Sequence, residues 1–388
     1  MIRFFFCSII FICSSLLKAQ QIRIGLYNSQ KISSIRFSLK NGSYFIFSDT
    51  ILISKVTVPD VVEMKLSEND QIQLILNNVT LNSFSDLSFV SEKNENYIET
   101  KITKPNLKPR LYEGDFTIRV KKDYLEIINE IDLEQYLEGV IESESGPGQK
   151  IEYYKVQAII SRTYAMKYRN KHETFGFNLC DGTHCQAYLH KRNQSSIIDS
   201  AIKYTRRMVL LDSMGQLAAT YFNANCGGQT CEPDAVWNQK ISGFSSFKDT
   251  FCINTSQAKW TKKIPLKDWF SFLEDKYHFP TWDSLSYNLA INFVQDERKA
   301  FYINPFYGIP LRDIRESFKL KSTYFDCIKE GDFIVLNGRG FGHGVGLCQE
   351  GAMNMVKRKY NFEQVLSFYY PGRQISVLPI SSFSLQKK

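Results

Sequence analysis

The sequence predicts an α+β fold with a β-rich N-terminal half, a central helical segment and a glycine-rich strand-to-helix loop near the C-terminus. Between residues 22 and 131, apolar side chains recur mostly at every second position, which is the period of a half-buried strand. Between residues 133 and 170 they recur at helical spacing. The rest of the chain mixes short strands and helices without the regular alternation of a doubly wound sheet, so an α+β arrangement is expected.

Turn residues divide the N-terminal half into strands. Residues 35–39 alternate, Asn41-Gly42 is typical of a tight turn, and residues 44–47 continue the alternation, so we expect a hairpin. Residues 91–110 are polar and contain prolines, and we expect a loop or an insert there. Further strands are expected at residues 71–76, 116–120 and 124–131.

The helical segment is interrupted once and is followed by mixed elements. A Gly-Pro-Gly break at residues 146–148 precedes a helix expected at residues 151–166. Asn361 and Gln364 have the spacing of a capping box, so another helix should begin there and end before the Pro-Gly pair at 371–372. Other expected elements are a helix at residues 195–206 and strands at residues 216–223 and 333–336.

Residues 1–19 are predicted to be a secretory signal peptide. Arg3 precedes an apolar stretch at residues 4–11, and Ala19 is a small residue suited to a cleavage point. The stretch is too short to span a bilayer, and no later one approaches the roughly 20 residues that a spanning helix needs. We therefore expect an exported protein, periplasmic or extracellular, with no membrane span after signal removal.

Composition limits the possible partners. Removing Arg3 and Lys18 from the 48 basic residues leaves 46 against 40 acidic ones. This mild and dispersed positive charge suits an anionic polymer such as cell-wall glycan, and it lacks the dense basic clusters of a nucleic-acid binder. Nine cysteines fall to seven without Cys7 and Cys13. In an exported protein disulfides are the default expectation, but an odd number leaves at least one thiol free, intermolecular or metal-bound.

The stretch GRGFGHGVGLCQEGA at residues 338–352 is the most informative motif. Glycine occupies every second position from 338 to 346. In an extended backbone one face would be bare, so another backbone or a flat ligand could approach closely. The other face would carry His343, and a helix with Gln349 and Glu350 should follow. The spacing fits neither a dinucleotide fingerprint nor a Walker loop, and simple close packing at a turn is the alternative.

The turn at residues 142–148 offers two candidates for a general acid. This turn holds Glu142 and Glu144 just before the helix at residues 151–166. Desolvation beside an apolar helix raises the pKa of a carboxyl group, as a general acid requires. The alternative is that both glutamates only favour the start of that helix through its dipole.

Two thiols and an imidazole lie close together at Cys180, His184 and Cys185. Thiolate and imidazole ligands suit zinc, but the spacing fits no common finger, and a local disulfide is the alternative. His184 and Gln186 could instead hydrogen-bond a polar substrate. The histidines whose sequence context predicts no site are His172, His190 and His278.

Cys226 stands beside a Gly227-Gly228 turn, where glycine allows a close backbone approach. This thiol could pair with Cys231 or Cys252. A Cys–His protease would need one exposed thiol beside a histidine with an orienting Asn or Asp, and the sequence singles out no such cysteine.

Four segments in order resemble the stage II sporulation protein D family, which also includes the LytB-type amidase enhancers. They are LEQYLEGVIESE at residues 133–144, KVQAIISRTYA at 155–165, NCGGQT at 225–230 and GFGHGVGLCQ at 340–349, continued by Gly351-Ala352. The resemblance covers about residues 22–371 and is weakest in the N-terminal β region. It implies one family domain at residues 20–375, with a β-rich part at 20–130 and a catalytic part at 131–375, before a tail at 376–388.

The resemblance implies a lytic transglycosylase that acts on peptidoglycan glycan strands, with a glutamate as general acid and base and 1,6-anhydro ends as products. The family's catalytic glutamate lies in a Ser-Glu-Met-Pro turn and matches Glu144. Ser145-Gly146 replaces Met-Pro here, so Glu142 is a reserve candidate. The residues implied to line the glycan cleft are Arg162, His184, Gln186, Tyr188, Gly227, Gly228, His343 and Gln349, with Tyr188 as a stacking face for a sugar ring.

The resemblance implies no cofactor for the cleavage, although some family members hold zinc in the segment that matches Cys180, His184 and Cys185. A second interpretation is a non-catalytic, peptidoglycan-binding enhancer of an N-acetylmuramoyl-L-alanine amidase. A third, a secreted disulfide-rich adhesion module, would need no acid in the cleft. Incubation with peptidoglycan alone separates the enzyme from the enhancer.

Overall fold

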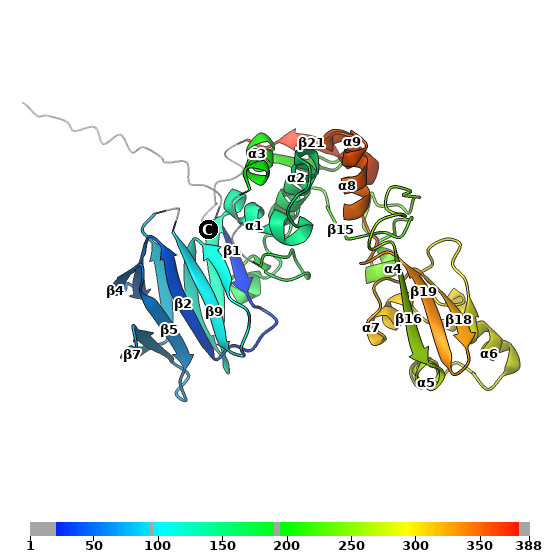
Figure 1. The fold of residues 1–388 in the computed structure, drawn as a ribbon, viewed down its shortest axis with the longest axis horizontal. Coiled ribbons are helices and arrows are strands. Elements are labelled where there is room, and N and C mark those ends of the chain that lie inside the picture. Colours follow the sequence, from blue (N-terminus) through cyan, green and yellow to red (C-terminus); the bar gives the residue numbers. More distant parts are fainter. Residues whose placement is uncertain (1–20, 94–95, 190–194, 380–388) are drawn as a thin grey trace, which may run out of the picture. The chain divides into compact units, whose positions relative to one another are not determined.

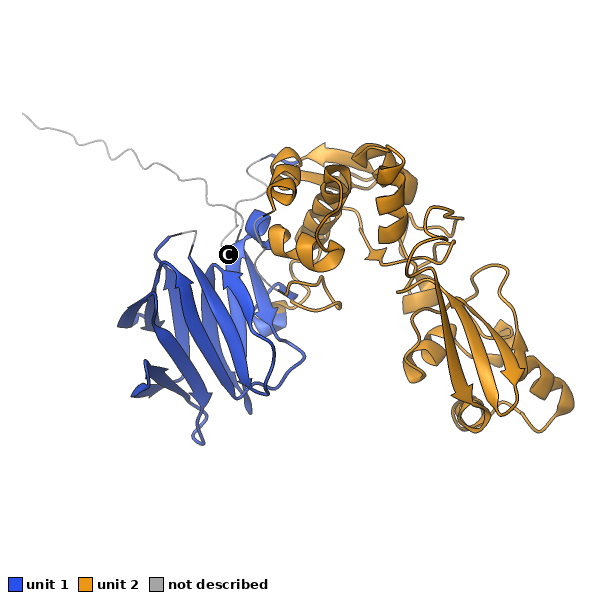
Figure 2. Ribbon diagram, viewed as in Figure 1, with its two compact units in different colours: residues 1–136, 174–180, 378–388 blue, residues 137–173, 181–377 orange. Residues whose placement is uncertain are grey.

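The computed structural model describes residues 21–93, 96–189 and 195–379, and the chain divides into two units (Figures 1 and 2). Unit 1 comprises residues 1–136, 174–180 and 378–388, and unit 2 comprises residues 137–173 and 181–377. Strands fill the N-terminal half and most helices follow it, which confirms the α+β prediction. The predicted signal peptide and residues 380–388 of the predicted tail lie outside the described residues.

Two sheets build unit 1. One has the strand order β13-β1-β12-β11-β8-β3-β4 and the other β10-β9-β2-β5-β6-β7. Phe37 of β2 lies 5.1 Å from Phe89 of β8, centroid to centroid, so buried side chains of both sheets share one core. The strands are β1 (Gln21–Leu26), β2 (Ser34–Asn41), β3 (Ser43–Ser48), β4 (Ile51–Thr57), β5 (Val61–Leu66), β6 (Ile72–Leu76), β7 (Val79–Phe84), β8 (Asp86–Ser91), β9 (Tyr97–Lys104), β10 (Arg110–Glu113), β11 (Asp115–Lys121), β12 (Tyr124–Asp132) and β13 (Leu179–Cys180).

The predicted strands at residues 71–76, 116–120 and 124–131 are confirmed as β6, β11 and β12. The hairpin prediction is wrong, because β2 pairs with β5 and β9 whereas β3 pairs with β4 and β8. Only Gly42 separates β2 from β3, which is too short for a two-residue hairpin loop. The loop prediction for residues 91–110 is also wrong, since β9 lies there and buries Ile98, Thr100 and Ile102.

A buried helix, α2 (Ile151–Lys167), organises part of unit 2. All of its residues from 153 to 165 are buried. Its polar side chains find partners inside the protein: Thr163 Oγ1 donates to the Ile159 carbonyl at 2.7 Å and accepts the Leu210 N–H at 2.9 Å. The helix contacts α3 (Ser196–Tyr204), β14 (Met208–Leu211), α8 (Gln349–Lys357) and α9 (Phe362–Tyr369).

The predicted helix boundaries in unit 2 are confirmed. The Gly-Pro-Gly break at residues 146–148 separates α1 (Leu133–Ser145) from α2, and α3 forms within residues 195–206. At the start of α9, Asn361 and Gln364 form both hydrogen bonds of a capping box. A helix, α8, begins at Gln349, directly after the glycine stretch.

A four-stranded sheet of order β16-β19-β18-β17 forms the other part of unit 2, and helices pack on it around a core that includes Trp269, Tyr302 and Phe325. The predicted strand at residues 333–336 is confirmed within β19 (Phe333–Arg339). Of the strand predicted at residues 216–223, only β15 (Phe222–Asn223) is regular, and it pairs in parallel with β20 (Leu347–Cys348). The other elements are η1 (Glu173–Phe175), α4 (Asp234–Trp237), β16 (Lys259–Pro265), α5 (Leu266–Tyr277), α6 (Ser284–Ile291), β17 (Asn292–Phe293), η2 (Pro305–Tyr307), α7 (Leu311–Ser317), β18 (Phe325–Glu330) and β21 (Gln374–Val377).

Candidate functional site

The end of α1 carries Glu144. Gly146 ends this helix with a φ of +67°, and its N–H donates to the Glu142 carbonyl at 2.9 Å. The Ala187 N–H donates to Glu144 Oε1 at 2.6 Å. Burial raises the pKa of Glu144 to about 7, because the ionised carboxyl loses solvation, while the Ala187 hydrogen bond opposes that shift. Near neutral pH this carboxyl can therefore give up or accept a proton, as a general acid or base must.

A pocket of about 830 Å³ opens beside Glu144 in unit 2. Glu144 is the only acidic side chain among the described residues that line it. The wall otherwise combines aromatic, amide, imidazole and cationic side chains. The other lining residues are Tyr164, Lys171, Thr183, His184, Cys185, Thr220, Tyr221, Phe222, Asn223, Ala224, Trp237, Gln239, Ile241, Arg315, Phe341, Gly342, His343 and Gln349.

The glycine stretch contributes to the wall of the pocket as the predicted strand-to-helix loop, and its backbone is not extended. The strand β19 ends at Arg339, and the glycines at 340, 342, 344 and 346 all have positive φ. At Gly346 a Cβ atom would lie 2.0 Å from the Tyr221 carbonyl oxygen, so a side chain does not fit. The expected close approach of another backbone is therefore present, but it occurs along a winding loop.

His343 lies in this loop and lines the pocket as a neutral imidazole. The Val345 N–H donates to His343 Nδ1 at 3.0 Å, so Nδ1 is an acceptor and the ring proton belongs on Nε2. Burial lowers the pKa of His343 to about 4, and the charges of Arg315 and Arg298 lower it further against a hydrogen bond to the Phe222 backbone. The ring is thus held by backbone groups and is uncharged at neutral pH.

Aromatic rings lie next to His343. The Trp237 ring is 5.2 Å from the His343 ring and 4.7 Å from the Tyr221 ring, measured between centroids. Trp237 remains 38% exposed and Phe341 41% exposed, and both line the pocket. Exposed aromatic faces of this kind offer a large apolar surface to a ligand.

Two cationic side chains, Lys171 and Arg315, also line the pocket. Lys171 Nζ donates to the His184 carbonyl at 2.6 Å and to the Tyr164 hydroxyl at 3.2 Å. Arg315 lies on α7 and donates through Nε to the Leu320 carbonyl at 3.3 Å. The pocket therefore has positive charge available for an anionic ligand.

Four residues predicted to act in the site line this pocket, namely Glu144, His184, His343 and Gln349. Gln349 Nε2 donates to the backbone carbonyl of Glu144 at 3.3 Å, which joins the start of α8 to the end of α1. Residues 205 positions apart in sequence are thus in direct contact.

The other residues predicted for catalysis or glycan binding do not line the pocket. Arg162 is fully buried and donates to the Met208 carbonyl at 3.1 Å. Tyr188 is 1% exposed, so its ring presents no open face for a sugar. A Cβ atom at Gly227 would lie 2.7 Å from the Arg339 backbone, so that turn serves close packing. The remaining predicted residues outside the lining are Gln186, Gly228 and the reserve acid Glu142.

Residues that the sequence motifs do not mark make up much of the pocket. Trp237 is the last residue of the short helix α4, and its spacing matches no motif, although an isolated tryptophan in a loop-rich segment is a usable signal for a ligand surface. Arg315 and Lys171 come from α7 and from the end of the α2 region, and only the tertiary fold brings them to the same pocket.

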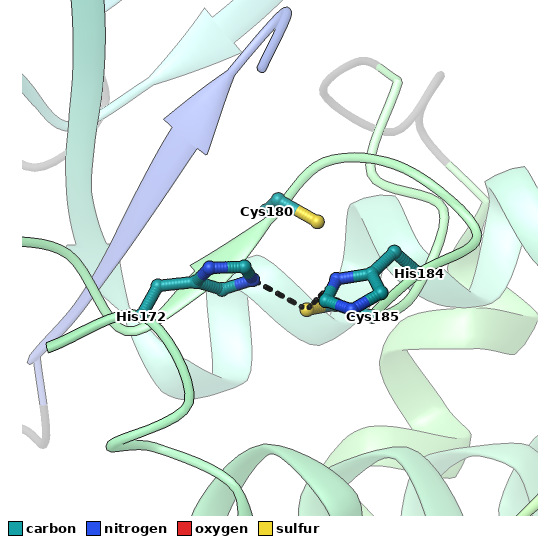
Figure 3. A group of neighbouring side chains, drawn as sticks. All are labelled: His172, Cys180, His184 and Cys185. Carbon is teal, nitrogen blue, oxygen red and sulfur yellow. Dashed lines mark hydrogen bonds between the residues drawn. The ribbon is translucent and has the colours of Figure 1, made fainter. Parts of the chain in front are cut away.

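Four potential metal ligands gather at His172, Cys180, His184 and Cys185, and their ligand atoms all lie within 4.8 Å of one another (Figure 3). Cys185 Sγ lies 3.4 Å from His172 Nε2 and 3.8 Å from His184 Nδ1. Two thiolates and two imidazoles form a common zinc ligand set. His172 thus joins the three predicted ligands, although its sequence context predicts no site.

The seven cysteines in the described part of the chain all carry free thiols. Cys180 and Cys185 are therefore not bonded to each other, and Cys226 is bonded neither to Cys231 nor to Cys252. Within the residues that the structure describes, no helix combines the length and apolar character that crossing a bilayer requires.

The part of the chain that matches a known family contains Glu144. Residues 121–211 match the family described as SpoIID, stage II sporulation protein. This stretch belongs to the SpoIID family. The relationship predicted from four motifs is thereby confirmed. Glu144, Arg162 and the four metal-ligand candidates lie inside the SpoIID stretch, whereas His343 and Gln349 lie outside it.

Similarity to named SpoIID proteins extends well beyond that stretch. The chain is 28% identical to stage II sporulation protein D of Bacillus subtilis over 305 residues, which cover 72% of this chain and 86% of that one. It is 28% identical to an uncharacterised protein of Brachyspira hyodysenteriae over 269 residues, covering 68% and 72%. It is 24% identical to the amidase enhancer of Bacillus subtilis over 293 residues, which cover 62% of this chain and 40% of the enhancer.

Proposed function

We propose that this chain is an exported peptidoglycan lytic transglycosylase that cleaves the glycosidic bond between N-acetylmuramic acid and N-acetylglucosamine. The observation that carries the proposal is the single acid of the pocket, Glu144, with its pKa raised to about 7. Hydrolytic glycosidases use two carboxyl groups, one of which activates water or attacks the sugar. A lytic transglycosylase needs only one, because the 6-hydroxyl of the sugar takes the place of water. The SpoIID match and the similarity to a protein named amidase enhancer support a role connected with the cell wall.

In the proposed reaction Glu144 acts twice. The protonated carboxyl gives its proton to the glycosidic oxygen, and the bond between this oxygen and C1 of N-acetylmuramic acid breaks. The 6-hydroxyl oxygen of the same sugar then bonds to C1, and the Glu144 carboxylate takes the hydroxyl proton. The products are a free N-acetylglucosamine 4-hydroxyl and a 1,6-anhydro end, with no water consumed. A carboxyl pKa near the working pH suits both proton transfers.

Other pocket residues would bind the glycan. Trp237 and Phe341 offer exposed aromatic faces for sugar rings, and neutral His343 supplies a fixed polar contact. Lys171 and Arg315 would attract the carboxylates of the lactyl group or of stem peptides. Gln349 would hold the backbone of Glu144 in place rather than touch the sugar.

We further propose that His172, Cys180, His184 and Cys185 hold zinc. The donor set fits, because zinc prefers four sulfur and nitrogen ligands in structural sites. The ion would supply a cross-link that fixes the segment carrying His184 against the pocket. His172 and Cys185 would be bound directly to it, and their hydrogen-bond distance of 3.4 Å is compatible with two ligands of one ion. Proton transfer by Glu144 does not pass through this group.

The decisive experiment compares Glu144→Gln with Glu142→Gln. Purified protein is incubated with peptidoglycan alone, both intact and stripped of stem peptides, and anhydro products are quantified by mass spectrometry. Glu144→Gln should release none, because the amide cannot transfer the proton, whereas Glu142→Gln should act like the wild type, because Glu142 does not line the pocket. Wild-type activity in Glu144→Gln would refute the proposal.

The similarity to a protein named amidase enhancer favours one second candidate, a non-catalytic activator of a cell-wall amidase. The same incubation separates the two functions. An enhancer would release nothing from peptidoglycan alone and would accelerate an added amidase. In that case Glu144→Gln should leave the acceleration unchanged.

A further inference from the structure

A second group of sulfur and oxygen ligands lies in unit 2, apart from the four candidates near the pocket. Cys226, Asp249, Cys252 and Cys348 each offer one ligand atom, and these atoms all lie within 4.8 Å of one another. All four side chains are 0% exposed. They come from three separate segments, the turn after β15, the loop at residues 249–252 and the residue that precedes α8. Segments that are distant in sequence therefore bring these four ligand atoms together.

The distances between the ligand atoms fit a shared ion. Cys226 Sγ lies 3.4 Å from Cys252 Sγ and 3.3 Å from Asp249 Oδ2. Sulfurs bound to one tetrahedral zinc at the usual bond length lie about 3.8 Å apart. A disulfide would place them about 2.05 Å apart. Four donors this close are also too tightly grouped to surround an iron–sulfur cluster, so a single ion is the better match.

Backbone N–H groups point at these sulfurs. Cys348 Sγ accepts the Cys226 N–H at 3.3 Å and the Gly351 N–H at 3.4 Å. Cys348 also caps the N-terminus of α8, where the helix dipole favours negative charge. Such hydrogen bonds stabilise a thiolate relative to a thiol and are typical of the surroundings of metal-bound sulfur.

Asp249 supplies a buried carboxylate to this group. Its oxygens accept the Tyr369 hydroxyl at 2.8 Å and the Phe251 N–H at 2.9 Å. Across the described part of the chain, no lysine, arginine or histidine forms an ion pair with it. A buried carboxylate is costly unless it is paired or bound to a metal. A Cβ atom at position 351 would lie 2.2 Å from the Tyr369 hydroxyl, so Gly351 leaves the space that this arrangement needs.

We propose that Cys226, Cys252, Cys348 and Asp249 bind one structural divalent metal ion of the thiophilic class, with zinc as the best match to three thiolates and a carboxylate. Each thiol loses its proton to solvent as its sulfur binds the ion, and no oxidant is needed. The ion joins the Asn-Cys-Gly-Gly turn to the start of α8, where Gln349 contacts Glu144. It therefore stabilises the wall of the pocket, and the proposal does not depend on the cleavage reaction.

The test removes the other metal-ligand group first. The full chain with His172→Ala, His184→Ala and Cys185→Ser is purified, and its zinc is measured by elemental mass spectrometry. One zinc per chain should remain, and adding Cys252→Ser should reduce it to near zero. Adding Cys327→Ser instead is the matched control, because Cys327 is also buried but lies outside the group, and one zinc should remain.

A second readout covers the case in which Cys252→Ser does not fold. The triple variant that retains all four proposed ligands is loaded with cobalt(II), which should give thiolate-to-cobalt charge-transfer absorption and the intense visible bands of tetrahedral cobalt. Absence of these bands, or zinc retained after Cys252→Ser, overturns the proposal. So does a Cys226–Cys252 disulfide peptide recovered from the wild type after denaturation and alkylation without reductant.

Discussion

Replacing Glu144 by glutamine should make the protein more stable at alkaline pH while it abolishes cleavage. Glutamine keeps the size of the side chain and an oxygen that can accept the Ala187 N–H. It removes only the ionisable group. In the wild type, burial raises the pKa of Glu144 from 4.5 to about 7, so ionisation of the folded protein at high pH is unfavourable.

The sign and size follow from linkage. Below pH 4.5 both the folded and the unfolded chain carry a protonated Glu144, and the raised pKa costs nothing. Between pH 4.5 and 7 the unfolded chain ionises first, so the free energy of unfolding falls as pH rises, and the loss is complete above pH 7. Each pKa unit corresponds to about 1.4 kcal/mol, which gives an upper limit of roughly 3 kcal/mol, because the side chain is partly exposed to the pocket.

Urea unfolding at pH 4 and pH 8 measures this effect. All four tryptophans lie in unit 2, at positions 237, 260, 269 and 282, so tryptophan fluorescence reports the unit that contains the site. Glu144→Gln and the wild type should have similar unfolding midpoints at pH 4, and the variant should be more stable by about 2–3 kcal/mol at pH 8. An equal difference at both pH values would refute the argument, because it would mean that the carboxyl is not perturbed by burial.

Three further predictions concern the pocket wall. Trp237→Ala should raise KM for glycan strands about tenfold with little change in kcat, since stacking is worth roughly 1 kcal/mol or more. Trp282→Ala, which removes an 87% exposed ring outside the pocket, should change neither KM nor kcat. An equal rise in KM for the two variants would refute the stacking role of Trp237. Gly346→Ala should lower the free energy of unfolding by at least about 2 kcal/mol, because the new methyl would meet a backbone oxygen at positive φ, whereas Gly372→Ala, with open space and a similar φ, should cost about 1 kcal/mol. The stabilising contribution of His343 should be lost as pH drops from 6.5 to about 4, because His343 is neutral in the folded state. The difference in the free energy of unfolding between the wild type and His343→Asn should therefore decrease over this range, and a difference that does not change with pH would contradict the lowered pKa.

Local chemistry made some elements predictable from the sequence. The capping pair Asn361 and Gln364 sets the start of α9 through its own hydrogen bonds, and Gly146 ends α1 because glycine adopts positive φ readily. These features depend on residues a few positions apart, so no tertiary information is needed to find them.

Features set by long-range pairing were not predictable in the same way. The alternation on either side of Gly42 predicts two strands, β2 and β3. It does not show that they belong to different sheets, because that depends on their partners in β5, β8 and β9. Likewise, the alternation of glycines did not show where the strand ends: β19 stops at Arg339, the glycines at 340, 342, 344 and 346 adopt positive φ, and Gly346 packs against the Tyr221 carbonyl oxygen. The pairing partners of a segment decide whether it forms a strand and in which sheet it lies, and the spacing of residues in the sequence does not identify those partners.

The candidate site was also predictable only in part from the sequence. Motifs led to Glu144, His343 and Gln349 because their local settings are unusual. They could not show that Tyr188 is buried or that Trp237 is exposed in the pocket, because both depend on which elements cover each ring. His172 was not predicted as a ligand, because its neighbours in sequence indicate no site and its ligand partners are supplied by the segment at residues 180–185.

The most direct test of the central claim is to run the reaction in water enriched in oxygen-18. If Glu144 directs the sugar's own 6-hydroxyl to C1, the released muramic acid ends will be 1,6-anhydro sugars that contain no heavy oxygen, and Glu144→Gln will release none. Products with reducing ends that carry oxygen-18 would mean that water attacks C1, and the single-acid account of this pocket would be contradicted.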